Sequence, residues 1–147
     1  GRSKRIPNPN SKNLLDGEIV RNDDGSPVKV PGMFKDVKGI GWYVDVYSRA
    51  QISINFNNFK VSTIHDVFDA ACTLANERGI RVTGSELVGL VPLEAMLESG
   101  RWYADQEVRD ERALVTAAIE GLGLDSLGSF DPDERIIEWA LLKAVSQ

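Results

Sequence analysis

The stretch that decides the fold runs from Gly39 to Pro92. It opens with Gly39-Ile-Gly-Trp-Tyr-Val-Asp-Val-Tyr47 and Ala50-Gln-Ile-Ser-Ile-Asn-Phe56, in which apolar residues alternate with polar or small ones. A period of two is typical of strands with one buried face. Because only Tyr47-Ser-Arg49 separates the two runs, we expect an antiparallel hairpin. The expected buried residues are Ile40, Trp42, Val44 and Val46 on the first strand and Ile52, Ile54 and Phe56, packed against a helix, on the second.

The polar residues of the second strand are unusual for a face in contact with water. Gln51, Ser53 and Asn55 offer amides and a hydroxyl but no charge, whereas solvated strands more often carry Lys or Glu. We therefore predict that these three residues line a cleft or face a second layer. An ordinary wet sheet face is the alternative.

A helix and a third strand follow the hairpin. Ser62 or Thr63 can cap a helix whose apolar side chains recur at helical spacing and whose end is marked by Gly79. Ile80-Arg-Val82 predicts the start of a third strand, and Gly84-Ser85-Glu86 places a hydroxyl and a carboxylate on a kink in it. Ser85 and Glu86 are thus candidate ligand contacts, unless the kink is simply an irregular strand end with Glu86 in water.

The two ends of the chain differ from this core. Residues 1–33 show no hydrophobic periodicity and read as an irregular loop or an insertion, with a small hairpin around Asp24-Gly25 as the alternative. Residues 93–147 read as three helices. The last is expected to begin at Asp131-Pro-Asp-Glu134 and to bury Ile136, Ile137, Ala140, Leu141 and Ala144.

Charge and composition exclude several classes of function. The net charge is −5; residues 1–35 hold 7 basic and 4 acidic residues (+3), which leaves 10 basic and 18 acidic residues (−8) in the rest. An acidic body disfavours nucleic-acid binding, even with a basic N-terminal stretch. No apolar run reaches the ~20 residues of a membrane helix. The single cysteine, Cys72, allows no internal disulfide and is compatible with the cytoplasm.

Familiar catalytic and metal-binding motifs are absent from the sequence. It contains no GxSxG, no P-loop, no GxGxxG and no CxxC. His65 is the only histidine, in the first turn of the expected helix and beside no second His or Cys, so we predict a structural residue and no metal site. The residues alone indicate an α+β domain with one polar sheet face and do not name a reaction.

Several ordered motifs resemble one family. Gly39-Ile-Gly-Trp-Tyr-Val, Ala50-Gln-Ile-Ser-Ile-Asn and Val82-Thr-Gly-Ser-Glu-Leu-Val-Gly-Leu-Val-Pro-Leu93 resemble glutamate formimidoyltransferase, the formiminotransferase part of formiminotransferase-cyclodeaminase. The resemblance continues through Gly121-Leu-Gly-Leu-Asp-Ser-Leu127 and Phe130-Asp-Pro-Asp-Glu-Arg-Ile-Ile-Glu138.

The resemblance covers the second of the family's two subdomains. It implies a ferredoxin-like antiparallel sheet followed by helices, with the strand-strand-helix-strand core over residues 34–92 as strands two, three and four. The first strand and most of the first helix are missing from this chain. A sheet with an unprotected edge predicts a fragment that is poorly stable alone or pairs with another segment or copy.

The resemblance also implies a function. Members transfer a formimino group from N-formimino-L-glutamate to tetrahydrofolate, the co-substrate, in histidine degradation. They bind folate between two facing sheets, which offers a reason for the polar row at Gln51, Ser53 and Asn55. The catalytic histidine belongs to the first subdomain, so we expect this chain alone to be inactive, to need that subdomain as partner and to be homodimeric in the complete enzyme. A noncatalytic ligand-binding or assembly module is the alternative.

Overall fold

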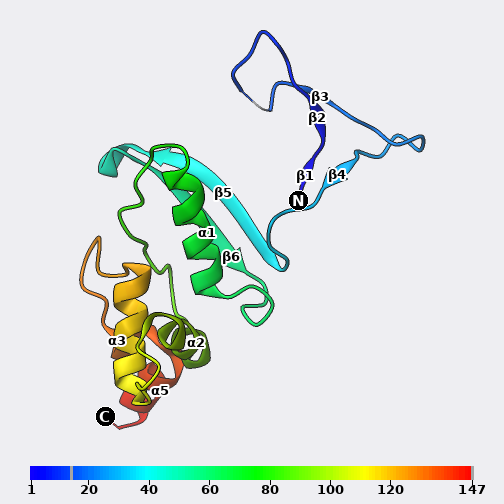
Figure 1. Cartoon of the computed structure of the whole chain (residues 1–147). Coiled ribbons are helices and arrows are strands. Elements are labelled where there is room, and N and C mark those ends of the chain that lie inside the picture. The colour runs from blue at the N-terminus through cyan, green and yellow to red at the C-terminus, as the bar shows by residue number, and fades with distance from the viewer. Residues whose placement is uncertain (14, 147) are drawn as a thin grey trace. The chain divides into compact units, whose positions relative to one another are not determined.

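The computed structural model describes residues 1–13 and 15–146. The chain forms two compact units, Gly1–Lys35 and Asp36–Gln147. Both strands and helices are present, so the predicted α+β class is confirmed (Figure 1). No helix among the described residues is both long enough and apolar enough to cross a membrane.

The first unit is built from very short antiparallel strands. β1 (Arg2–Ser3) pairs with β4 (Lys29–Val30), and β2 (Arg5–Ile6) pairs with β3 (Glu18–Ile19). An isolated bridge between Arg21 and Pro27 encloses a turn in which Gly25 has φ +81°. The Asp24-Gly25 turn is therefore a hairpin, as the alternative reading had it. Residue Leu14 of this segment lies outside the described part of the chain.

The second unit begins with the predicted antiparallel hairpin. β5 (Val37–Val44) pairs along its whole length with β6 (Arg49–Phe56), through a 3-10 turn at Asp45–Tyr47. Ser48 closes this turn in the left-handed conformation, with φ 50°. Strand pairing and direction are as expected, but Val46 lies in the turn rather than in the strand.

The register shows that the apolar rows of the two strands lie on opposite faces. Ile40 is opposite Ser53 and Trp42 is opposite Gln51, and side chains directly opposite each other in an antiparallel pair share a face. The expectation of a buried row on β5 is therefore wrong: Ile40 is 67% exposed and Trp42 is 47% exposed. A shift of one residue in register exchanges the two faces of a strand, and the alternation within each strand does not reveal it.

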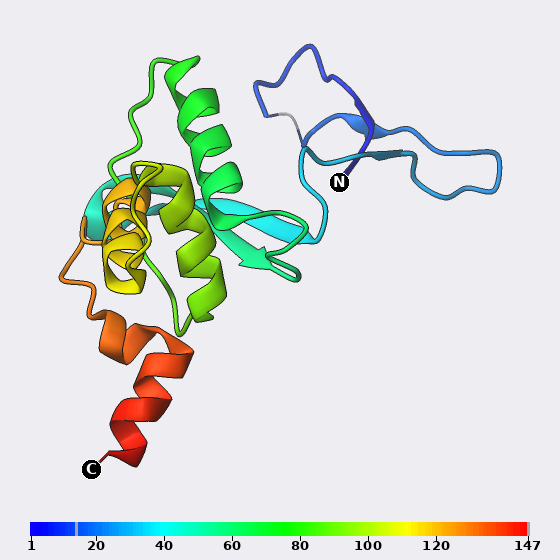
Figure 2. The same ribbon diagram turned by 60° about the horizontal axis from the view of Figure 1, so that its bottom comes forward.

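The other face of the hairpin becomes more buried toward the end that leads into the first helix. Ile54 and Phe56 are half-buried, whereas Ile52 and Tyr43 are 65% and 60% exposed. Figure 1 draws α1 (Ile64–Asn76) across the β5–β6 hairpin, and the turned view in Figure 2 shows that the start of α1 lies close to the strands while the rest of the helix rises away from them. Ile54 and Phe56 lie at the end of β6 from which the chain continues toward α1, and this end of the hairpin is the better covered one.

The predicted third strand does not form. Residues 80–90 are neither strand nor helix, and β5 and β6 make a two-stranded sheet in the part of the chain that the structure describes. Ser85 instead hydrogen-bonds to the end of a later helix, and Val91 pairs in a single parallel bridge with Ile136. The backbone N–H groups of Ser85 and Val91 donate to Gly123 and Arg135, outside the β5–β6 sheet.

Two packed helices form most of the core. α2 (Leu93–Tyr103) lies against α3 (Glu111–Leu122), which Asp110 caps by accepting from the Ala113 N–H at 2.9 Å. Fully buried side chains such as Met96 and Leu122, each 1% exposed, contribute about 1.5–3 kcal/mol apiece by leaving water. The core cluster comprises Val91, Ala95, Met96, Val115, Ala118, Ile119, Ile136 and Trp139.

The C-terminal helix is interrupted. α4 (Pro132–Arg135) ends at Ile136, whose extended backbone (φ −93°, ψ 123°) separates it from α5 (Ile137–Val145). The break changes the helical phase, so Trp139 is buried while Leu141 is 61% exposed and Ala144 is also exposed. The expectation that Leu141 and Ala144 are buried is therefore wrong, because it assumed one unbroken helix.

Candidate functional site

One face of the β5–β6 hairpin unites three of the five predicted site residues. The register places four opposed pairs on it: Lys38 with Asn55, Ile40 with Ser53, Trp42 with Gln51 and Val44 with Arg49. We call these eight residues the mixed face, because β5 supplies an apolar and aromatic row and β6 supplies a polar row. At 3.3–3.4 Å per residue, the four pairs span about 20 Å.

The polar row is partly accessible. Gln51 and Ser53 are half-buried and Asn55 is exposed. An amide both donates and accepts hydrogen bonds, and a hydroxyl does the same, so the row can match a ligand whose edge alternates donors and acceptors. Sequence reasoning found this row but missed Trp42 and Ile40 beside it, because it assigned both to the buried side of the strand.

Charge on the hairpin differs from that of the rest of its unit. β5 and β6 contain two cations, Lys38 and Arg49, and no carboxylate; Asp36 and Asp45 lie just outside β5. Residues 36–147 as a whole hold 18 acidic and 10 basic residues. The register places Lys38 and Arg49 on opposite strands, at opposite ends of the mixed face. The arrangement suits an elongated ligand that carries negative charge.

Ser85 and Glu86 belong to a different part of the unit. The Ser85 hydroxyl donates to the Leu122 carbonyl oxygen at 2.6 Å, and the Ser85 N–H donates to the Gly123 carbonyl oxygen at 3.0 Å. Ser85 therefore satisfies carbonyl groups that the end of α3 leaves without a helical partner. Glu86 is exposed. The hydrogen bonds of Ser85 are thus made to α3 and its C-terminal turn, and the oxygen of its hydroxyl retains capacity to accept.

Gly84 holds this loop in place. Its φ is +144°, and a Cβ there would collide with the side chain of Ser126 and the carbonyl oxygen of Gly123. Only glycine fits so close an approach in that backbone conformation. The kink that the sequence indicated is therefore a docking point on α3.

His65 is buried in this fold, where its ring contacts α2; its structural role stays a prediction. It is 6% exposed, and its ring stacks on Trp102 with centroids 5.2 Å apart. Its Nδ1 lies 3.4 Å from the Ser99 hydroxyl, which itself donates to the Ala95 carbonyl oxygen. Because the Ser99 hydroxyl hydrogen is already donated to Ala95, the Ser99 oxygen accepts a hydrogen bond from Nδ1 of His65. Nε2 of His65 then accepts from the Thr63 hydroxyl at 3.1 Å.

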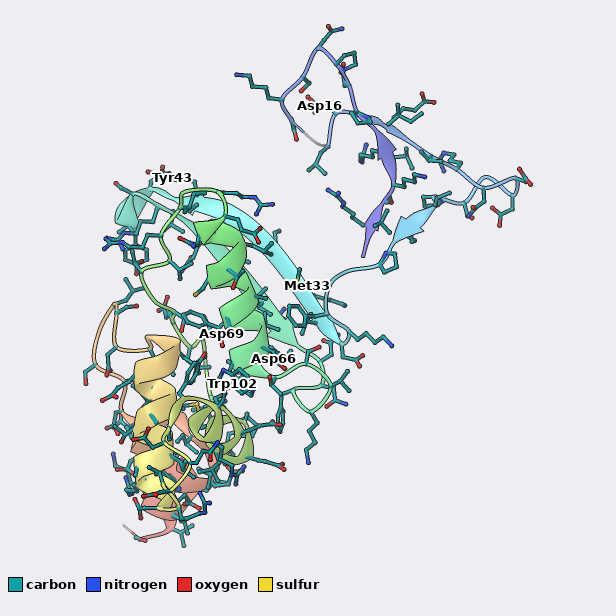
Figure 3. All side chains as sticks on the ribbon, viewed as in Figure 1. Asp16, Met33, Tyr43, Asp66, Asp69 and Trp102 are labelled. Atoms are coloured by element: carbon teal, nitrogen blue, oxygen red, sulfur yellow. The ribbon has the colours of Figure 1, made fainter. Side chains whose placement is uncertain are left out.

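Asp69 completes this junction between α1 and α2. One of its carboxylate oxygens accepts from Trp102 Nε1 at 2.9 Å and the other from the Tyr103 hydroxyl at 2.8 Å. The side-chain view shows Asp66 and Asp69 of α1 and Trp102 of α2 gathered here, away from Tyr43 at the far end of β5 (Figure 3). Burial and the hydrogen bond to Asp69 raise the pKa of Tyr103 well above its ordinary value. The cluster joins two helices and leaves no nitrogen of His65 available to a substrate.

Another charged cluster joins α3 to the C-terminal helices. Arg112 makes a bidentate ion pair with Asp133, at 2.8 and 3.2 Å, and its guanidinium lies 4.2 Å from the centre of the Trp139 ring. The pair lowers the pKa of Asp133. A surface hollow of about 560 Å³ adjoins it and contains none of the five predicted site residues. Among the described residues no group of three or more His, Cys, Asp and Glu side chains is arranged to hold a metal ion.

Comparison with known proteins agrees with the motifs in the sequence. The model of the formiminotransferase domain family matches residues 16–142. The formimidoyltransferase-cyclodeaminases of Mus musculus and Dictyostelium discoideum are each 46% identical over 112 residues, which cover 74% of this chain and 21% of the relative. The glutamate formimidoyltransferase of Streptococcus pyogenes serotype M1 is 32% identical over 76 residues, or 52% of this chain and 25% of that protein.

The chain spans about a fifth of the length of the cyclodeaminase relatives it matches. The match nevertheless includes the β5–β6 hairpin, the 83–86 loop and the helical core. The family expected from the motifs is confirmed, and the chain belongs to the formiminotransferase domain family.

Proposed function

We propose that this chain supplies the folate-binding part of a glutamate formimidoyltransferase. The complete enzyme transfers the formimino group of N-formimino-L-glutamate to tetrahydrofolate, in the degradation of histidine. The first subdomain of the family provides the catalytic groups, and this chain provides a surface for the co-substrate. Gln51, Ser53 and Asn55 form one part of that surface, and Ser85 and Glu86 form another.

One observation carries the proposal: the uncharged polar row of β6 lies on a hairpin with two cations and no carboxylate, inside an otherwise acidic unit. Folate pairs a ring edge rich in donors and acceptors with a tail that bears carboxylates. Gln51 and Asn55 can hydrogen-bond such an edge, and Lys38 or Arg49 can attract the tail.

Proton transfer in the reaction requires a group that reaches the substrate. His65 does not meet this condition, because it is 6% exposed and both ring nitrogens already have partners. The absence of a free histidine in this chain agrees with a role in binding, with catalysis left to the first subdomain. The hairpin would then form part of a ferredoxin-like sheet that is completed by segments outside this chain.

Calorimetric titration of folinic acid tests the proposal. The chain is titrated alone and then together with the first subdomain of the family, supplied as a separate polypeptide. We expect binding and formimino transfer only in the mixture. If neither sample binds folinic acid while both are well folded, the chain is instead a noncatalytic module that retains the fold.

A triple substitution then tests the polar row. Gln51→Ala, Ser53→Ala and Asn55→Ala together remove its side-chain hydrogen bonds. We expect at least a tenfold loss of affinity for folinic acid, since each hydrogen bond contributes about 0.5–1.5 kcal/mol. Unchanged affinity and turnover in the mixture would remove the polar row from the site. Tyr43→Ala, on the opposite face of the same hairpin, is the matched control.

A further inference from the structure

The apolar row of the mixed face has no role in the proposed hydrogen bonding, yet it is largely exposed. Trp42 remains 47% exposed and Ile40 67% exposed, side by side with the half-buried Gln51 and Ser53 across the register. Large hydrophobic side chains at such positions mark a binding surface when they adjoin placed polar groups. The combination of a flat aromatic ring, an aliphatic neighbour and amides fits a flat heteroaromatic ligand better than it fits another apolar layer.

We propose that Trp42 is the stacking platform for the ring system of the co-substrate, and that a cation at one end of the mixed face receives its carboxylate tail. This inference rests on the proposed function, because folate is a ligand of that description. It adds three residues, Lys38, Trp42 and Arg49, which the analysis of the sequence did not include in the site.

Geometry and charge support this ligand over a second copy of the chain. The mixed face is about 20 Å long, and Lys38 and Arg49 lie at its two ends on opposite strands. Within β5 and β6 no carboxylate is present, so the strands of a second copy would offer Lys38 and Arg49 no opposite charge to pair with. An anionic ligand is attracted by the same charges, and a π-system lies well against the indole ring.

The chain offers a matched control for the stacking residue. Tyr43 follows Trp42 on β5, is 60% exposed and lies on the opposite face, where it is opposite Ala50. Trp42→Leu and Tyr43→Leu therefore remove comparable aromatic surface from the two sides of one hairpin. Thermal melting of each variant verifies that the hairpin still folds, and Trp42→Phe retains an aromatic ring if Trp42→Leu does not fold.

The experiment measures the affinities of three compounds for the chain combined with the first subdomain. Folinic acid represents the whole ligand, pterin represents its ring, and p-aminobenzoyl-L-glutamate represents its tail. We expect Trp42→Leu to weaken folinic acid and pterin by about tenfold or more, with a smaller loss for Trp42→Phe and none for Tyr43→Leu. Lys38→Gln or Arg49→Gln should weaken folinic acid and p-aminobenzoyl-L-glutamate and leave pterin unchanged.

The outcomes separate this inference from the function on which it rests. One outcome refutes the stacking platform alone. In it, the wild type binds folinic acid, the triple variant of Gln51, Ser53 and Asn55 no longer binds folinic acid, and Trp42→Leu retains full affinity for pterin. The proposed function then stands. If neither cation variant affects p-aminobenzoyl-L-glutamate, the assignment of the tail is wrong. If the wild-type mixture does not bind folinic acid, the proposed function and the inference both fail.

Discussion

Asp69 joins two helices through a single side chain. Its two oxygens accept from Trp102 and Tyr103 of α2 while its backbone belongs to α1, and His65 stacks on the same Trp102. Hydrogen bonds to a charged acceptor contribute more than neutral ones, about 1.5–3 kcal/mol each. The polar cluster therefore fixes which residues of α1 and α2 meet.

The titration of Tyr103 provides a residue-scale prediction. Its pKa in the folded state is raised above the ordinary value of 10.0, first by burial and then by the hydrogen bond to Asp69. Because the pKa of Tyr103 is higher in the folded chain than in the unfolded chain, its contribution to stability is fully present below the pKa of the unfolded chain. That contribution is lost as the pH rises from the unfolded-state pKa through the folded-state pKa. We expect the free energy of unfolding to fall above pH ~10 more steeply in the wild type than in Tyr103→Phe.

Urea unfolding at a series of alkaline pH values measures this difference. Tyr43→Phe is the control, because Tyr43 is 60% exposed and lies on the hairpin. We expect it to retain the wild-type slope. Equal slopes for wild type and Tyr103→Phe would contradict a raised pKa of Tyr103 in the folded chain.

At the scale of elements, the close approach of α2 and α3 depends on two glycines. A Cβ at Gly100 would collide with the backbone of Leu114, and a Cβ at Gly121 would collide with the ring of Tyr103. Each glycine costs its helix roughly 0.5–1 kcal/mol relative to alanine, so the contact between the helices must contribute more than this. Small residues here allow the side chains of the core cluster to meet.

Gly100→Ala tests this packing. Alanine favours a helix, so an isolated helix would be stabilised. We expect the reverse, a loss of about 1–3 kcal/mol in the free energy of unfolding, because the backbone of α3 has to move. Gly128→Ala, with no atom within 4 Å of the added Cβ, should change stability by less than about 0.5 kcal/mol. Urea denaturation measures both, and an equal effect of the two substitutions would refute the close contact.

The whole second unit combines a well-buried helical core with a sparsely covered hairpin. All eight residues of the core cluster lie between Val91 and Trp139. On the hairpin, Ile40, Trp42, Tyr43 and Ile52 are each between 47% and 67% exposed. A two-stranded ribbon is marginal on its own, and unpaired strand edges invite pairing with other chains.

Amide hydrogen exchange should reveal this division. We expect amides of α2 and α3 to exchange slowly and those of β5 and β6 to exchange much faster, because exposed hydrogen bonds with few apolar contacts open locally. Mass spectrometry of the chain alone and of the chain with the first subdomain measures both states. Slower exchange on the hairpin in the mixture is expected. Protection of the hairpin equal to that of α3 in the chain alone would count against the prediction.

The sequence by itself determined the β5–β6 hairpin, the helix α1 and the family. Alternation predicted β5 and β6, helical spacing and a cap at Ser62 or Thr63 predicted α1, and the ordered motifs identified the formiminotransferase domain family. These features depend on residues close together in the chain, where propensity and periodicity act directly.

Only the tertiary structure decided which faces these elements share. The register of the β5–β6 pair places Trp42 opposite Gln51, on one face of the hairpin. The alternation within each strand had suggested that these two residues lie on different faces. Residues 80–90 form no strand, and Gly84 and Ser85 lie against the end of α3 instead. Trp139 is buried and Leu141 is exposed because the helix breaks at Ile136. Each of these outcomes depends on contacts between residues distant in sequence, which no local pattern encodes.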